Sequence, residues 1–402
     1  MRIRRALLGG LVLLAVGVAA VLALRRPAGD GGAAGPIVIG LLSSGDAPQL
    51  AAAGLAVDEL NRGAGLLGRR VALRVEDARA GAGEAARRLI VEGRAVALFG
   101  CGTSDCRQQV RPVVEAQRHL LFYPMAHEGM ERSAHIVYTG PTPNQQVLPA
   151  TDWAMGGFGR RVYLVGTEGP FLRGVHAVLR DFIPLHGGQV LGERHVPPDS
   201  PDMAAVVTDL RRMRPALVLS TLRGASNQAF FDALVAAELG DVPLLSFVAS
   251  EPELRAYGGG RLDLHFTAWS YLQSLPGPAN AAFLARLRAL NGPDAQASDP
   301  AVAIYVAVHL WAAAVRELGG LQTEAVNASV LQQVVEAPDG FAAPDAQTRR
   351  LWRPLRIAQV RPDGQLTEVW RTSAPIRPSV WPTYRSLEHW RGLMAAYAEQ
   401  RR

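Results

Sequence analysis

Hydroxyl and backbone N–H groups gather at one predicted turn, where Gly102, Thr103 and Ser104 follow an apolar run and precede a helical pattern. The free N–H groups of a helix start, with a hydroxyl beside them, can bind the carbonyl oxygen of a small polar solute. Ser104 could instead serve only as the N-cap of that helix. The turn lies where a parallel strand is predicted to end, and open α/β sheets bind ligands there. We therefore expect these three residues to contact a ligand.

Other candidates follow further apolar runs. Tyr123 ends one such run and Glu128 lies in the loop behind it. A carboxylate can accept the N–H groups of a small polar solute, and aromatic faces exclude water. The alternative roles are core packing for Tyr123 and solvation or hinge pairing for Glu128. The second half of the chain adds residues that follow predicted strands or lie near a probable hinge crossing, namely Glu168, Gly169, Phe171, Thr221, Glu251 and Trp269.

Apolar runs alternate with amphipathic stretches along the chain, which is typical of βαβ repetition in a mostly parallel sheet. Strands are predicted at 37–42, 70–76, 95–99, 119–123, 135–138, 162–165, 189–196, 216–220, 244–248 and 263–268. Helices are predicted at 48–61, 84–92, 105–117, 172–183, 203–213 and 227–239, before a long helical region at 278–336 and a hairpin at 356–371. One sheet of so many strands would be unusually wide. We therefore predict an α/β protein of two doubly wound lobes, residues 37–145 with about 272–345 and residues 146–271 with about 346–402.

The composition is that of a globular protein with a large core. The 402 residues are 49% hydrophobic and 19% charged, and all 42 basic residues are Arg. The net charge is +6, but the Arg residues are scattered among Asp and Glu and form no nucleic-acid-binding signature. We therefore expect no nucleic-acid partner.

The N-terminus reads as an export segment. Residues 1–5 carry three Arg and residues 6–24 carry no charge, as in a secretory signal or a membrane-spanning anchor. We expect 1–26 to be a signal peptide or an anchor that contacts the membrane, followed by a linker at 27–36. Either alternative places the body in the periplasm or outside the cytoplasm.

Two cysteines, Cys101 and Cys106, flank the turn described first. Export would allow a disulfide between them, but short-range geometry is demanding, and we favour two small buried thiols. A hydrolytic enzyme is the main alternative class, with Ser104 or a cysteine as the nucleophile. Cys106 stands where a Gly-x-Ser-x-Gly elbow needs its last Gly, and we find no metal-spaced His/Cys cluster. We expect no enzyme activity, no metal and no cofactor.

The residues of the proposed site resemble those of a known family. The elements are Gly100-Cys101-Gly102-Thr103-Ser104, Tyr123-Pro124, Glu128-Gly129, Tyr138-Thr139-Gly140, Pro143-Asn144-Gln145-Gln146, Ser250-Glu251, Asp299-Pro300 and Pro375-Ile376-Arg377-Pro378. They resemble the substrate-binding proteins of urea transporters and the related amide-sensing regulators. Both belong to the type I periplasmic binding proteins, near the branched-chain amino-acid binders.

The resemblance implies two lobes that close about hinge strands over urea, a short-chain amide or a related solute. It also implies that the position of Met125 contributes to the pocket. The partner would be an ABC permease, or a membrane sensor partner if the chain is a receptor of a signalling system. Departures at Gly102, Gly169 and Phe171 remove or change aromatic residues that the family carries. We therefore expect a roomier cleft and a ligand larger than urea, such as a larger amide, a ureide or an amino-acid-like molecule.

Overall fold

The computed structural model describes residues 35–257 and 264–399, and residues 37–402 form one compact unit. The expected signal peptide or anchor at 1–26 and most of the expected linker at 27–36 lie outside the described residues. Within the compact unit the strands form two seven-stranded sheets and a separate two-stranded one. The prediction of two doubly wound α/β lobes is thereby confirmed.

Lobe 1 contains the first sheet and most of the N-terminal half. Its strands are β1 (Ile37–Ser43), β2 (Val71–Asp77), β3 (Leu98–Gly100), β4 (Leu121–Tyr123), β5 (Ile136–Tyr138), β13 (Pro344–Asp345) and β14 (Arg350–Leu351), with the small pair β11 (Val335–Ala337) and β12 (Gly340–Ala342). Its helices are α2 (Ala47–Asn61), α3 (Ala82–Arg87), η1 (Arg88–Glu92), α4 (Ser104–Ala116), α10 (Pro278–Asn291), α11 (Asp299–Leu318), α12 (Thr323–Ser329) and η2 (Val330–Gln332). The strand order is β13-β14-β5-β4-β3-β1-β2, and only β13 runs antiparallel to its neighbour.

Lobe 2 repeats this plan with the strand order β16-β15-β10-β9-β8-β6-β7. Its strands are β6 (Arg161–Thr167), β7 (Gln189–Val196), β8 (Leu217–Thr221), β9 (Leu244–Ser246), β10 (His265–Trp269), β15 (Arg356–Val360) and β16 (Leu366–Arg371). Its helices are α5 (Val147–Phe158), α6 (Pro170–Leu185), α7 (Ala204–Met213), α8 (Gly224–Ala236), α9 (Glu251–Ala256) and α13 (Leu387–Glu399). The antiparallel pairing of β15 with β16 confirms the hairpin predicted at 356–371.

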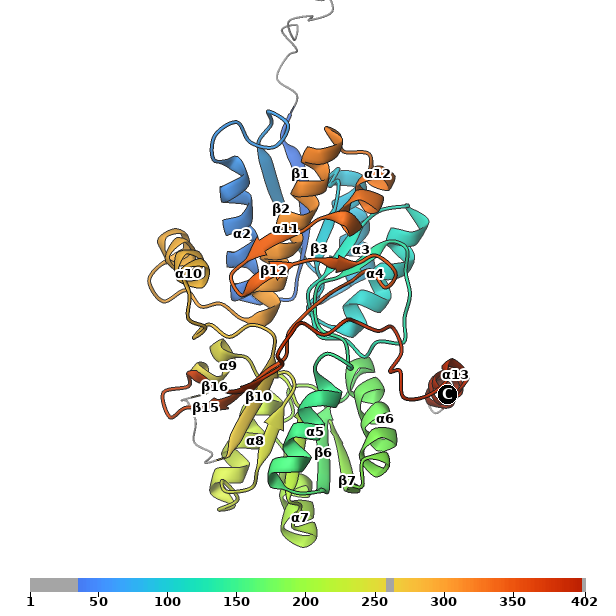
Figure 1. Cartoon of the computed structure of the whole chain (residues 1–402), viewed down its shortest axis with the longest axis vertical. Helices are drawn as coiled ribbons and strands as arrows, with labels where there is room; N and C mark the ends of the chain where they lie inside the picture. Colours follow the sequence, from blue (N-terminus) through green and yellow to red (C-terminus); the bar gives the residue numbers. More distant parts are fainter. Residues whose placement is uncertain (1–34, 258–263, 400–402) are drawn as a thin grey trace, which may run out of the picture. The chain divides into compact units, whose positions relative to one another are not determined.

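Each sheet of the two lobes is buried between layers of helices. In lobe 1, α2 and α11 lie side by side over one face, while α3 and α4 cover the other (Figure 1). Among the described residues α11 is the one helix long and apolar enough to cross a membrane, but most of it is buried in this core. It is therefore a core helix of lobe 1.

The helical region predicted at 278–336 consists of three α-helices and the short 3₁₀-helix η2, and its last two residues belong instead to β11. The helices are separate because Gly292-Pro293 follows α10 and Gly319 ends α11 in the left-handed conformation, with φ of 62°. Glycine takes that conformation without a steric penalty and commonly ends helices. At its other end α11 is capped by Ser298, whose hydroxyl accepts the N–H of Ala301.

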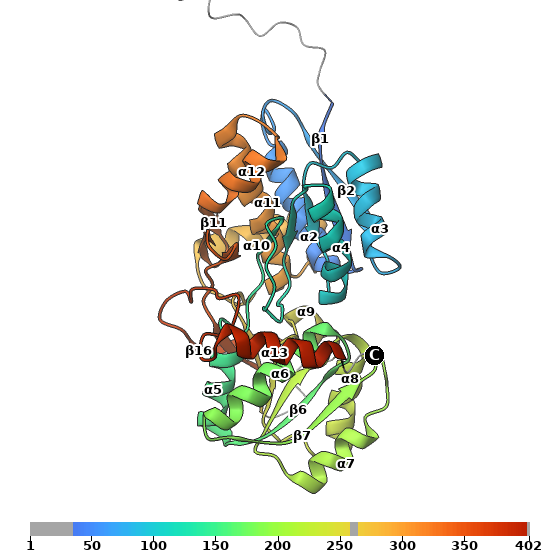
Figure 2. The ribbon, with the colours of Figure 1, turned by 90° about the vertical axis from the view of Figure 1, so that its right-hand side faces the viewer.

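Three chain segments cross between the lobes, at 139–146, 270–277 and 352–355. The third crossing begins after β14, so Arg350 and Leu351 belong to the sheet of lobe 1, a few residues beyond the division expected near 345. The C-terminal segment then returns to lobe 2, where α13 lies against α6 and Trp390 is buried (Figure 2). Three crossing segments therefore connect the lobes, as in a hinged binding protein.

Candidate functional site

Two adjoining cavities open between the lobes. Their volumes are about 640 Å³ and about 210 Å³, and they share four lining residues, Thr103, Asp199, Arg223 and Gly224. Lobe 1 lines the larger cavity with Ser44, Gly45, Asp46, Pro48, Gln49, Gly102, Met125, Ala126, Ser298 and Pro300, and lobe 2 with Val248, Ser250, Pro252, Glu253, Ala256, Tyr257 and Trp269. We call the two cavities together the interlobe cleft.

The cleft lies at the topological switch points of both sheets. In lobe 1 the strand order reverses between β1 and β3, whose following loops supply Ser44 and Thr103. In lobe 2 it reverses between β6 and β8, whose following loops supply Glu168 and Arg223. Loops that diverge at such a point leave a crevice for a ligand. The parallel topology of each lobe therefore builds half of the cleft.

Eight of the twelve predicted site residues line this cleft. They are Gly102, Thr103, Ser104, Met125, Glu168, Gly169, Phe171 and Trp269. The other four, Tyr123, Glu128, Thr221 and Glu251, are buried behind its surface and do not line either cavity. Their contact with a ligand stays a prediction.

The alternative in which Ser104 is the N-cap of α4 is wrong. The cap is Thr103, whose backbone is extended, with φ of −145° and ψ of 160°, and whose hydroxyl accepts the N–H of Cys106 at 3.1 Å. Ser104 is instead the first residue of α4, and its hydroxyl donates to Glu128 Oε2 at 2.6 Å. Because Thr103 is the cap, the Ser104 side chain takes part in the buried hydrogen-bond network behind the cleft.

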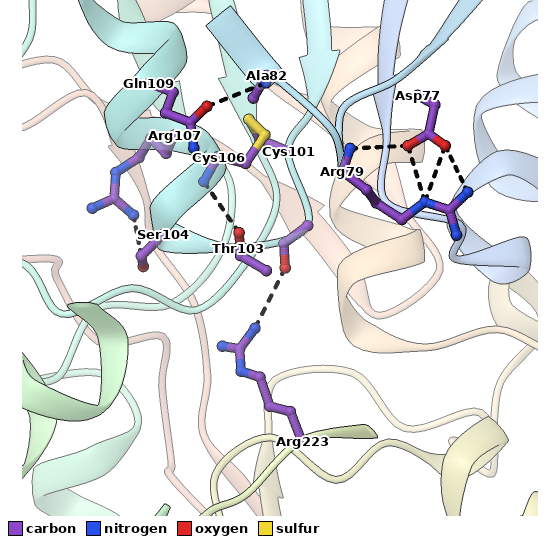
Figure 3. The surroundings of a disulfide bond; sticks show 11 residues. Asp77, Arg79, Ala82, Cys101, Thr103, Ser104, Cys106, Arg107, Gln109 and Arg223 are labelled. Atoms are coloured by element: carbon purple, nitrogen blue, oxygen red, sulfur yellow. Dashed lines mark hydrogen bonds and ion pairs between the residues drawn. A yellow bond between two sulfur atoms is a disulfide. The ribbon is translucent and has the colours of Figure 1, made fainter. Parts of the chain in front are cut away.

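The preference for unpaired thiols is also wrong, because Cys101 and Cys106 form a disulfide beneath this turn (Figure 3). Cys101 adopts a positive φ of 72° directly after β3, which folds the chain back so that the two Cα atoms lie 5.4 Å apart. That separation is within the range a disulfide spans. The bond fixes the turn that carries Gly102 and Thr103.

A buried ion pair supports the turn from behind. Arg107 Nη2 lies 2.7 Å from Glu128 Oε1, and neither side chain is more than 5% exposed. Burial alone would raise the pKa of Glu128, but the Arg107 guanidinium and the Ser104 hydroxyl outweigh it and lower that pKa. Glu128 is thus an ionised structural partner of Arg107. The guanidinium also stacks on Tyr123, with its carbon 4.8 Å from the ring centroid.

Glu251 lies beside the second crossing segment. Its Oε2 accepts the backbone N–H of Gln273 at 2.5 Å, and burial raises its pKa to about 7 despite this bond. Thr221 is likewise engaged, with Oγ1 3.3 Å from Nε2 of His176. Glu251 therefore holds the backbone of the second crossing segment, and Thr221 contacts the His176 ring.

The Glu251 carboxyl should keep its proton well above the pH at which an exposed glutamate ionises. The pKa is about 7 in the folded protein against 4.5 for the unperturbed group, so between these values only the folded state holds the proton. The stability contributed by this group is therefore complete below pH 4.5 and is lost as the pH rises through 7. Infrared spectra at pH 6 should show a protonated carboxyl band that Glu251→Gln removes. A carboxyl already ionised at pH 6 would contradict the expectation.

Sequence reasoning missed Arg223, the one cationic side chain among the described residues that lines both cavities. Arg223 follows β8, and its guanidinium carbon lies 4.8 Å from the centroid of the Phe171 ring. It extends from lobe 2 toward the turn of lobe 1, where Nη1 is 3.4 Å from the carbonyl oxygen of Gly102 (Figure 3). Its Nη2 is buried and has no hydrogen-bond partner among the described residues. Its position three residues past the end of the strand predicted at 216–220 could have identified it.

Two carboxyl groups border the larger cavity on opposite sides. Asp46 of lobe 1 caps α2 through the N–H of Gln49, and Glu253 of lobe 2 forms a capping box with Ser250. Burial is the main cause that raises the pKa of each carboxyl. Arg223 lines the same cavity, so the cleft presents both acidic and basic groups to a solute.

Fold and cleft together define a two-lobed binding protein of the α/β class. The family model described as periplasmic binding protein domain matches residues 38–387, and the chain belongs to this family. The architecture is the type I periplasmic binding protein fold, as predicted. Family membership implies a periplasmic location and a role in binding rather than catalysis.

Solved structures support the assignment of the fold. A solute-binding protein of an ABC transporter from Rhodopseudomonas palustris BisB5, in complex with 3,4-dihydroxybenzoic acid, is 21% identical with a TM-score of 0.75, over 85% of this chain and 98% of that one. A second from R. palustris, in complex with 4-hydroxybenzoate, is 20% identical with a TM-score of 0.76 over the same shares. An amino acid ABC transporter substrate-binding protein from Pseudomonas fluorescens Pf-5 is 16% identical with a TM-score of 0.74, over 88% of this chain and all of that one. These likenesses concern the fold.

Proposed function

We propose that this chain is the extracytoplasmic solute-binding component of an ABC-type transporter and that its lobes close over one small polar solute. The interlobe cleft supports this, because it lies at both switch points and is lined from both lobes. The three solved structures described above are ABC transporter components, and two of these three have aromatic acids bound. A solute that touches both lobes would favour their closed arrangement, which a permease can recognise.

The volume of the cleft favours a ligand larger than urea. The larger cavity alone measures about 640 Å³, within the range of sites for drug-sized molecules. Urea would leave most of that space to water. A larger amide, a ureide or an amino-acid-like solute fits the space better.

Arg223 is the single observation that favours one class of solute, a molecule with a carboxylate. The unpartnered Nη2 of Arg223 offers a charge-assisted hydrogen bond inside the cleft. The carboxyl groups of Asp46 and Glu253 lie on the walls of the same cavity, where their oxygens can accept hydrogen bonds from an ammonium group of the same solute. An amino-acid-like zwitterion satisfies both. Short-chain amides are the second candidate, favoured by the Thr103 hydroxyl and by the N–H groups at the start of α4.

Arg223→Gln should weaken binding of carboxylate solutes by about 10- to 100-fold, because a hydrogen bond to a charged group contributes about 1.5–3 kcal/mol. Binding would be measured by thermal shift and calorimetry with matched pairs, such as benzoate with benzamide, propionate with propionamide, and leucine with leucinamide. The amide of each pair has the same shape and no negative charge.

The control is Arg288→Gln, at an exposed position of α10 outside the cleft lining, which should leave every affinity unchanged. Binding of only the amides, unaltered by Arg223→Gln, would favour the second candidate. Failure to bind any small solute across a broad library of acids, amides, ureas and amino acids would contradict the solute-binding proposal itself.

A further inference from the structure

Three potential metal ligands meet on lobe 2 although sequence spacing did not suggest a metal site. Glu193 and His195 are two residues apart on β7, so they project from the same face of the strand. Helix α6 packs on β7 and brings His176 to them. His176 Nδ1 lies 2.9 Å from Glu193 Oε1, and His195 Nε2 lies 2.5 Å from the same oxygen. One donor atom from each residue lies within 4.8 Å of the other two.

The other polar atom of each of these side chains has a partner of its own. His176 Nε2 faces Thr221 Oγ1 at 3.3 Å, and His195 Nδ1 faces Glu168 Oε2 at 3.1 Å. Glu193 Oε2 accepts from Arg180 Nη1 at 2.8 Å. Such outer contacts fix the ring orientation and tautomer of ligating histidines in metal sites. The contacts here turn one nitrogen of each ring, and one oxygen of the carboxylate, toward a common point.

We propose that His176, Glu193 and His195 bind a divalent transition-metal ion of the zinc class. Two imidazoles and one carboxylate form a three-ligand set that Zn²⁺ accepts, with the fourth position left to water or another small ligand. Imidazole nitrogens suit Zn²⁺, Ni²⁺ and Cu²⁺, whereas Ca²⁺ and Mg²⁺ require oxygen ligands. The partly exposed His195, at 38%, provides an entry path for the ion.

The zinc-class site is independent of the proposed solute, but it adjoins the interlobe cleft through one residue. Glu168 lines the smaller cavity and also contacts His195. A metal held by His195 would orient Glu168 and its ion-pair partner Arg173. Metal binding should therefore rigidify one wall of the cleft.

The test uses the purified full-length chain, first stripped with a chelator. Zn²⁺ would be titrated against a chromophoric competitor, and Co²⁺ would report the coordination geometry by its visible spectrum. We expect one ion per chain, with no comparable binding of Ca²⁺ or Mg²⁺. His195→Gln and Glu193→Gln should each weaken Zn²⁺ binding by about 100-fold or more and change the Co²⁺ spectrum. Glu168→Gln, which removes only an orienting contact, should weaken it by about 10-fold.

The matched control is His186→Gln, which removes a histidine at the C-terminal end of the same helix, where its Nδ1 faces the carbonyl of Phe182. This variant should bind Zn²⁺ like the wild type. Circular dichroism and urea unfolding would show that each variant is folded. The proposal is overturned if the wild type binds no Zn²⁺ saturably, or if folded His195→Gln and Glu193→Gln bind it as tightly as the wild type does.

Discussion

Glu128→Ala should lower the free energy of unfolding by about 3–5 kcal/mol, because it leaves a buried guanidinium without its closest counter-charge. The Arg107 side chain has no exposed surface and lies 2.7 Å from Glu128. Its other carboxylate partner, Glu131, is at 3.1 Å and also accepts the hydroxyl of Tyr138. Ser104 would lose its acceptor at the same time. The loss would be measured by urea unfolding. The dependence of the unfolding free energy on urea concentration should be the same for the wild type and the variant.

A surface pair provides the comparison for this loss. Glu84→Ala removes an exposed partner of Arg87, and exposed pairs contribute at most about 1 kcal/mol. The double variant Arg107→Met/Glu128→Leu should recover much of the Glu128→Ala loss, because buried ion pairs replaced by apolar residues are often tolerated. A Glu128→Ala effect no larger than that of Glu84→Ala would contradict the assignment of Glu128 as a structural counter-ion.

The pH dependence of this loss has a definite sign. The folded-state pKa of Glu128 is lowered by Arg107 and Ser104 against the effect of burial. The stability that it contributes is therefore present above the unfolded-state pKa and is lost as the pH falls through the folded-state pKa. Wild type and Glu128→Ala should accordingly converge in stability as the solution is acidified.

Much of the fold could be read from the sequence, because both lobes repeat short apolar runs with amphipathic helices between them. The parallel pairing of β1 with β2 and β3 agrees with the predicted βαβ repetition, and the carboxyl ends of parallel strands meet at one edge of the sheet. This is why Thr103 from lobe 1 and Glu168 from lobe 2, far apart in sequence, could both be expected at the cleft. Strand-end position is a local property that a sequence displays.

The features that were missed depend on tertiary packing. The disulfide depends on the positive φ of Cys101, and a cysteine at that position does not predict this backbone conformation. The role of Glu128 depends on Arg107, which lies 21 residues earlier in the chain and is carried by α4. The histidine and glutamate cluster depends on how α6 seats on β7. In each case the packing of helices and strands determines which residues meet. The spacing of these residues along the sequence does not predict the contact.

Arg223 combines a local feature that the sequence predicts with a tertiary contact that it does not. Its place just after β8 is local, but its reach toward Gly102 depends on how lobe 2 faces lobe 1. A rule that considers every charged residue within a few positions of a strand end would have included it. That rule would also have included many solvated side chains, so the sequence alone could not rank it.

Asp299→Ala should be as costly as Glu128→Ala, about 3–5 kcal/mol, because Asp299 joins the segments that cross between the lobes. Its Oδ2 accepts the backbone N–H groups of Ser270 and Tyr271, at 3.0 and 2.8 Å, in the second crossing. The same oxygen lies 2.6 Å from Nη2 of Arg353 in the third crossing. Arg353 also donates to the carbonyl of Thr139 in the first.

One carboxylate thus holds two otherwise unpaired amides and a buried cation at the hinge. Asp299→Asn, which keeps an oxygen acceptor but loses the charge, should cost less than Asp299→Ala, and the exposed Asp58→Ala on α2 should cost little. Hydrogen exchange separates a hinge role from general destabilisation, because the amides of Ser270 and Tyr271 should lose protection in Asp299→Ala more than core amides of β1 do. Equal loss across both regions would instead indicate that Asp299 supports lobe 1 alone, as the first residue of α11.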